Sequence, residues 1–258
     1  MKTFLTFGMA YFLSFCPSVM AEEYFHDVPA KWESEFRRVM KNLRTCLGEF
    51  DIDIVAWPSS DKAPFLDGKR VAGGQYVSGR RDGSGKDRIM MVLEIDVSEL
   101  EGGHPHMLSV IAHEYFHVYQ RLQNPSLNRG LSIKWLIEGS AAVFESMYLR
   151  DFEQVSDYAE TAQLRHAKSS EFGAKMEEYE NQEVNYGTST AMVLSACKEF
   201  GFQRMVDFWK RQPSDENWKQ IFEEIFGISV ERFYEEGKGV PPSSLRVSDM
   251  GELGGGRF

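Results

Sequence analysis

Residues 105–122 predict a helix that is apolar around most of its circumference and polar at one place in its middle. Its polar residues near the centre are mainly His113, Glu114 and His117. A helix with apolar residues on most sides is buried, and buried polar groups need partners. The segment therefore predicts a central helix that carries a polar site. Its apolar residues are Met107, Leu108, Val110, Ile111, Ala112, Tyr115, Phe116, Val118 and Tyr119.

The polar residues of this helix form an H-E-x-x-H pattern. His113 and His117 are one turn apart and share a face, so both imidazoles can reach one zinc ion. Glu114 lies beside them, where it can contact a water at the metal without binding the metal itself. Glu138, on a later segment, could complete a His2Glu site and leave a fourth position open. A metal, a base and an open position are the parts that hydrolysis of an amide requires.

Composition restricts the classes of protein that the chain can represent. Its 258 residues suit one domain or a domain with a small companion, and 42% hydrophobic residues can form a core. A formal net charge of −10 argues against nucleic-acid binding, which needs a basic surface. Beyond residue 21 no apolar stretch is long enough to span a bilayer, so we expect no stable membrane insertion of the mature chain.

The first 21 residues have the pattern of an export signal. Lys2 supplies the positive start, residues 3–15 are largely apolar, and a small-residue cleavage pattern ends at Ala21. The apolar run is short for a membrane anchor, which needs about 20 residues. A lipoprotein signal ending at Cys16 is disfavoured by the bulky Phe15. We expect cleavage near Ala21 and a secreted or periplasmic mature chain.

Two cysteines, Cys46 and Cys197, remain once the signal segment is removed. An even number of cysteines in an oxidising compartment allows a disulfide. Free cysteine is also a common small core residue, and sequence alone cannot bring the two Cα atoms within reach of each other. The sequence leaves both alternatives open.

Hydrophobic periodicity predicts a mainly helical chain with few strands. Strands are expected at residues 52–57 and 89–97, with loop and hairpin over residues 58–88. From residue 239 Pro, Ser and Gly dominate, which predicts a flexible tail over residues 239–258. Helices are expected over residues 29–47, 105–122, 132–149, 188–200, 205–211, 218–226 and 230–236, with a further acidic segment of helical character at 152–183.

The chain resembles the gluzincin metallopeptidases, and more closely the bacterial peptidase MA-like group. The specific likeness is the pairing of HEYFH at residues 113–117 with WLIEGSA at residues 135–141. A weaker likeness at Tyr186-Gly187 and further on extends the resemblance over about residues 89–236. The resemblance implies an α+β fold, a mainly helical zincin-like catalytic domain over residues 22–238, with a small N-terminal β-sheet whose edge borders the active-site cleft.

The resemblance also implies roles for individual residues. It implies that His113, His117 and Glu138 bind Zn2+ and that Glu114 is the general base. Tyr186 is the candidate oxyanion donor, with a core tyrosine as the alternative. We expect the strand at residues 89–97 to form the edge of the cleft on which an extended peptide lies.

Related metallopeptidase classes are not supported by the sequence. Metzincins are excluded, because Gln120 and Gln123 stand where their glycine and third histidine would be. The glycine-x-methionine-glutamate-asparagine signature of exopeptidases is not visible, so the pattern does not indicate an aminopeptidase. Whether the chain acts as an endopeptidase or an exopeptidase is open.

Several other polar residues are candidates for a lesser role. Glu145 follows Glu138 by two helical turns and could hold a ligand histidine in place, with an exposed acid as the alternative. His104 and His106 begin the central helix, and we expect them to be surface residues rather than ligands. Arg80, Arg81, Lys86 and Arg88 crowd one Gly-rich stretch, and we expect them to be solvated.

Together these patterns predict an exported zinc metallopeptidase that acts on a peptide or protein substrate. One alternative is a non-catalytic envelope protein that keeps a structural or binding zinc site. Another is a zinc hydrolase that acts on cell-wall amides. Glu114 favours catalysis, because a purely structural site has no use for a base. The sequence leaves the cleavage specificity and the oligomeric state open.

Overall fold

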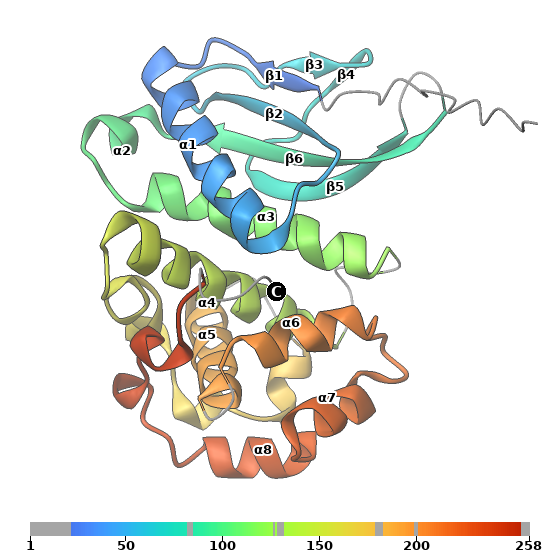
Figure 1. Ribbon diagram of the computed structural model, residues 1–258, viewed down its shortest axis with the longest axis vertical. Coiled ribbons are helices and arrows are strands. Elements are labelled where there is room, and N and C mark those ends of the chain that lie inside the picture. Colours follow the sequence, from blue (N-terminus) through green and yellow to red (C-terminus); the bar gives the residue numbers. More distant parts are fainter. Residues whose placement is uncertain are drawn as a thin grey trace, which may run out of the picture.

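The computed structural model describes residues 22–81, 85–125, 127, 132–178, 183–198 and 201–253. The predicted signal segment, with Cys16, and residues 254–258 of the predicted tail lie outside the described residues. Within the described ranges the fold is α+β, with a small mixed sheet above a larger helical part (Figure 1). This coarse class is the one that the sequence predicts.

The sheet of the described residues has the strand order β1-β2-β6-β5. Strands β1 and β2 are parallel, β2 and β6 are parallel, and β5 runs antiparallel to β6. A separate hairpin, β3 and β4, pairs Phe65 with Arg70. The strands are β1 (Glu23–Phe25), β2 (Ile52–Pro58), β3 (Phe65–Leu66), β4 (Lys69–Arg70), β5 (Gln75–Arg81) and β6 (Asp87–Ile95).

Both faces of the central strands β2 and β6 are largely buried, and alternate residues serve each face. Ile54 and Leu93 belong to the main core, which also contains residues of the long helices. Val55, Trp57 and Val92 point to the opposite face and form a smaller cluster, against which Leu66 packs. Burial on both faces explains why β2 reads as a nearly continuous apolar run rather than an alternating one.

Helix α3 lies between the sheet and helices α4–α8 (Figure 1). It packs against α1, β5 and β6 on one side and against α4 on the other. This position explains why its sequence is apolar nearly all round. The helices are α1 (Ala30–Leu47), α2 (Val97–Glu101), α3 (His106–Gln123), α4 (Lys134–Glu153), α5 (Glu183–Cys197), α6 (Gln203–Lys210), α7 (Trp218–Phe226) and α8 (Val230–Gly237).

The prediction that the strand at residues 89–97 forms an edge of the sheet is wrong. Strand β6, which covers most of the predicted strand at residues 89–97, lies inside the sheet between β2 and β5. The edge strand on the side of β6 is β5, in a stretch predicted as loop and hairpin. Its exposed, charged residues weaken the periodic signal, because only Val77 of this strand is fully buried.

In the C-terminal half, residues 159–178 form short, irregular helical turns, in line with the helical character expected of this segment. The predicted tail is not flexible over residues 239–253, since Leu245, Val247, Met250 and Leu253 are buried in the main core. Arg150 of α4 also donates a hydrogen bond to the Val247 carbonyl at 2.6 Å.

Cys46 and Cys197 are both buried and both free. Of the two alternatives that the sequence left open, the structure has two core thiols rather than a disulfide.

Of the helices within the described ranges, none has the length and hydropathy that crossing a bilayer requires.

Candidate metal centre

The described structure brings His113 and His117 of α3 together with Glu138 of α4. The Nε2 atoms of His113 and His117 are 3.0 Å apart. A carboxylate oxygen of Glu138 lies 3.6 Å from Nε2 of His113 and 3.4 Å from Nε2 of His117. The two helices pack side by side, and Glu138 reaches the imidazoles from the second of them. The three side chains that the sequence analysis groups together therefore lie next to one another in the structure.

The donor set and its spacing fit zinc. Zinc–nitrogen and zinc–oxygen bonds of about 2.0–2.1 Å place tetrahedral ligand atoms about 3.3 Å apart. The three separations of 3.0, 3.4 and 3.6 Å lie close to that value. Two imidazoles and a carboxylate also leave one tetrahedral position open, as catalytic rather than structural zinc sites do.

The electrostatics of the group also favour a cation. Burial by itself would lower the pKa of His113, but the carboxylates of Glu145 and Glu138 outweigh it and hold that pKa well above the usual value. Burial would raise the pKa of Glu138, but His117 and His113 reverse this and hold that pKa well below the usual value. The pocket thus stabilises positive charge between its carboxylates, as protons or as a metal ion.

The second nitrogen of His113 is held by residues from α4 and α5. Its Nδ1 lies 3.0 Å from a carboxylate oxygen of Glu145 and 3.1 Å from the hydroxyl of Tyr186. Tyr186 also donates a hydrogen bond to Glu145 at 3.2 Å, and Gln163 donates another to the same carboxylate. A carboxylate on Nδ1 fixes the ring orientation and makes Nε2 a better ligand. The predicted supporting role of Glu145 is thus matched by its position.

The second nitrogen of His117 has a partner that the sequence analysis did not identify. Its Nδ1 lies 2.7 Å from Oε1 of Gln120. The amide nitrogen of Gln120 donates to the Ile137 carbonyl at 3.0 Å and to the Ser140 hydroxyl at 2.8 Å. Trp209 of α6 donates to the same hydroxyl at 3.2 Å. The available signal was Gln120 itself, a fully buried polar residue one turn after His117.

Glu114 opens onto a cavity beside the ligands. Its side chain is buried, with 5% exposed, and it lines a cavity of about 480 Å3 together with His113, Tyr186 and Gln75 of β5. On the other side, Val77 of β5 lines a small pocket with His117 and Glu138. The edge strand β5 therefore borders the site on both sides of the candidate ligands.

Tyr186 lies at the first turn of α5, and its hydroxyl contacts Nδ1 of His113, on the side of the ring away from Glu138. Its ring stacks on that of His113 with centroids 5.9 Å apart. This geometry supports the orientation of His113 more directly than the donation of a hydrogen bond to an oxyanion. The oxyanion role of Tyr186 stays a prediction.

The predicted solvation of the arginine cluster is wrong for two residues. Arg88 is buried and its Nε donates to Asp53 at 2.9 Å. Arg80 donates to the other oxygen of Asp53 at 2.7 Å. Asp53 is fully buried in β2, so the two arginines neutralise a charge inside the sheet, while Arg81 remains exposed. His104 and His106 lie at the start of α3 with exposed side chains, as expected.

Comparisons of the chain with protein-family models, with curated proteins and with solved structures found no match.

Proposed function

We propose that this chain is an exported zinc-dependent metallopeptidase with a zincin-like catalytic domain. The observation that supports it is the spacing of the ligand atoms of His113, His117 and Glu138, with Glu114 beside them in a cavity. A site of this kind with a neighbouring carboxylate is equipped for hydrolysis of an amide.

The residues have distinct roles in this proposal. His113, His117 and Glu138 hold the metal, while Glu145 and Gln120 orient the two imidazoles. Zinc bound there supplies a Lewis acid and lowers the pKa of water towards about 7. Glu114 accepts the proton of the attacking water and delivers it to the nitrogen of the leaving amine. The burial of Glu114 keeps bulk water from competing for that proton.

The position of β5 supports a peptide as the proposed substrate. This strand is paired with β6 on one side only and borders the ligands at Gln75 and Val77. An extended peptide can add to such an edge through main-chain hydrogen bonds. We therefore propose that β5, in place of the strand expected from the sequence, carries the peptide substrate.

The test is the variant Glu114→Gln, which keeps the size of the side chain and removes its basicity. We expect one bound zinc in both proteins and a loss of turnover of about 10²–10⁴-fold in the variant. Casein-like peptides and peptidoglycan fragments are assayed in parallel. Cleavage of peptidoglycan fragments alone would replace the peptidase by a cell-wall amidase. If the wild type binds zinc but cleaves neither substrate, the peptidase proposal fails and the non-catalytic zinc protein is supported.

A further inference from the structure

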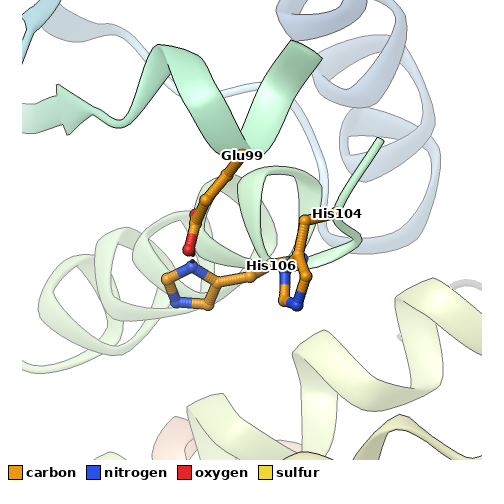
Figure 2. Close-up of side chains that lie close together, drawn as sticks. All are labelled: Glu99, His104 and His106. Carbon is orange, nitrogen blue, oxygen red and sulfur yellow. Dashed lines mark hydrogen bonds and ion pairs between the residues drawn. The ribbon is translucent and has the colours of Figure 1, made fainter. Parts of the chain in front are cut away.

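A second group of metal-ligating side chains lies at the start of α3. Glu99 of α2, His104 of the connecting turn and His106, the first residue of α3, each offer one ligand atom, and the three atoms lie within 4.8 Å of one another. Figure 2 shows the carboxylate of Glu99 directed at the ring of His106, with the ring of His104 beside it. Nδ1 of His106 lies 2.8 Å from Oε2 of Glu99.

The chemistry of this group matches that of a transition-metal site. Two imidazoles and one carboxylate form the same donor set as the buried centre. Ligand atoms around one zinc ion are about 3.3 Å apart, so His106 and Glu99 would separate slightly and His104 would approach. The side chains of His106 and Glu99 are 45% and 30% exposed, which leaves room for such rotations.

The position of the group connects it to the buried centre. Glu99, His104 and His106 line the same cavity of about 480 Å3 as His113 and Glu114. Glu145 contributes a further carboxylate to this cavity, so three carboxylates and one arginine, Arg165, line it. A cation is favoured in a cavity lined by several acidic groups, because opposite charges attract more strongly where water is partly excluded.

We propose that Glu99, His104 and His106 bind a second divalent transition-metal ion, of the zinc class, in the cavity that leads to Glu114. Binding of this ion rests on the geometry of the three residues alone. Its effect rests on the proposed function: an ion held there occupies the space through which substrate approaches Glu114, so excess zinc inhibits hydrolysis. Because these ligands are more exposed than those of the buried centre, the second ion binds more weakly and exchanges more readily.

A purely structural role is the competing explanation of the same contacts. The Glu99–His106 ion pair links α2 to α3, and Nδ1 of His104 accepts a hydrogen bond from the backbone N–H of His106 at 3.2 Å. In that case the group orders the start of α3 and binds no ion. The number of metal ions bound to the folded chain separates the two explanations.

The experiment is a calorimetric zinc titration of the metal-free protein, whose stoichiometry counts weakly and tightly bound ions alike. The double variant His104→Asn/His106→Asn removes the second group. Glu138→Gln weakens the buried centre. His26→Asn is the matched control, because His26 is an exposed histidine 3.4 Å from Asp27 and belongs to no three-ligand group of the described residues. Circular dichroism checks that each variant is folded.

We expect two zinc ions in the wild type and in His26→Asn, and one tight ion in the double variant. Retention of two ions by the double variant, or a single ion in the wild type that Glu138→Gln abolishes, would overturn the second site. A single ion in the wild type that only the double variant loses would support the second site and contradict the buried one. The two proposals therefore fail in distinguishable ways.

The effect on catalysis is read from the same proteins with a peptide substrate. Zinc beyond the first equivalent is expected to lower the turnover of the wild type by about tenfold, because the second ion occupies the approach to Glu114. A tenfold loss corresponds to about 1.4 kcal/mol in the activation free energy. The double variant is expected to keep its activity under the same conditions. Equal inhibition of both proteins would show that the inhibitory ion binds elsewhere and would overturn the proposed effect.

Discussion

Gln120 shows how much of the candidate site depends on one side chain that is not a ligand. It accepts a hydrogen bond from His117 and donates two to α4, so it joins the ligand of one helix to the helix that carries Glu138. Loss of a group that orients a ligand histidine typically weakens metal binding without removing it.

We predict that Gln120→Leu lowers zinc affinity by about 10–100-fold, because Nδ1 of His117 loses its acceptor. Competition with a chromophoric chelator measures this affinity. Gln123→Leu is the control, since Gln123 is the other glutamine in the last turns of α3. Equal affinities for the two variants would contradict the positioning role.

The raised pKa of the Cys197 thiol predicts how the unfolding free energy changes at alkaline pH. Burial raises the pKa of this thiol from 9.0 to about 12. Between these two values the folded chain keeps a proton that the unfolded chain releases. The thiol's contribution is therefore complete below pH 9 and falls as pH rises, by at most about 1.4 kcal/mol per pH unit. Urea unfolding at several pH values should show a shallower decline for Cys197→Ala, and parallel declines would refute this account.

The contact between α4 and α5 depends on the absence of a side chain at Gly139, the residue after Glu138. A Cβ atom there would lie 2.5 Å from the Ser189 carbonyl oxygen and 2.9 Å from Cγ2 of Val193. The two helices can approach this closely only because Gly139 has no Cβ. Their separation in turn sets where Glu138 and Tyr186 lie relative to His113.

Gly139→Ala should therefore push the two helices apart and cost about 1–3 kcal/mol of unfolding free energy. We also expect weaker zinc binding, because Glu138 moves with its helix. Denaturant unfolding and a zinc titration measure the two effects. Gly239→Ala is the control, since the nearest atom to its added Cβ is at an ordinary 3.6 Å. A fully stable Gly139→Ala would show that the helices can separate at little cost.

The sheet contains a cluster of one buried aspartate and two arginines that joins three of its strands. Asp53 of β2 accepts hydrogen bonds from Arg80 of β5 and Arg88 of β6. Removing one member of such a group leaves an uncompensated charge inside the protein. The arrangement therefore holds the edge strand β5 in register with the interior of the sheet.

Asp53→Ala should lower the unfolding free energy by about 3–5 kcal/mol, because buried Arg88 loses its buried partner and keeps only the half-exposed Asp51, 3.0 Å away. Asp87→Ala, at an exposed ion pair with Arg81, should change it by less than about 0.5 kcal/mol. Denaturant unfolding of both variants tests the contrast. Similar losses in the two variants would mean that burial of Asp53 adds nothing.

In the molecule as a whole, the candidate metal centre joins α3, which supports the sheet, to α4, which begins the helical part (Figure 1). A metal that binds the native state alone stabilises it, by about 4 kcal/mol at a thousandfold excess over its dissociation constant. We expect zinc to raise the melting temperature and a chelator to reverse the rise. Glu138→Gln should show a clearly smaller rise in differential scanning calorimetry, and an undiminished rise would place the stabilising metal elsewhere.

Elements with strong helical periodicity were predicted with nearly correct bounds, as α1, α3 and α7 show. The grouping of His113, His117 and Glu138 was also predictable, because helical spacing fixes the first two and the later motif indicates the third. Strand β5 was missed, since its polar residues carry little periodic signal. The packed segment over residues 239–253 was missed because Pro and Gly suggested a tail, while Leu245 and Met250 are separated too irregularly to indicate burial.

Local sequence was sufficient for the central helix and for the shared face of His113 and His117, because side-chain direction along a helix depends on spacing alone. Gln120 and the second histidine group are local in the chain, since Gln120 is three residues after His117 and the group lies within residues 99–106. The contacts of Glu145 and Tyr186 with His113, and the edge strand beside them, depend on the packing of α3 against α4 and of α4 against α5. These contacts join residues far apart in the chain, and no local pattern encodes them.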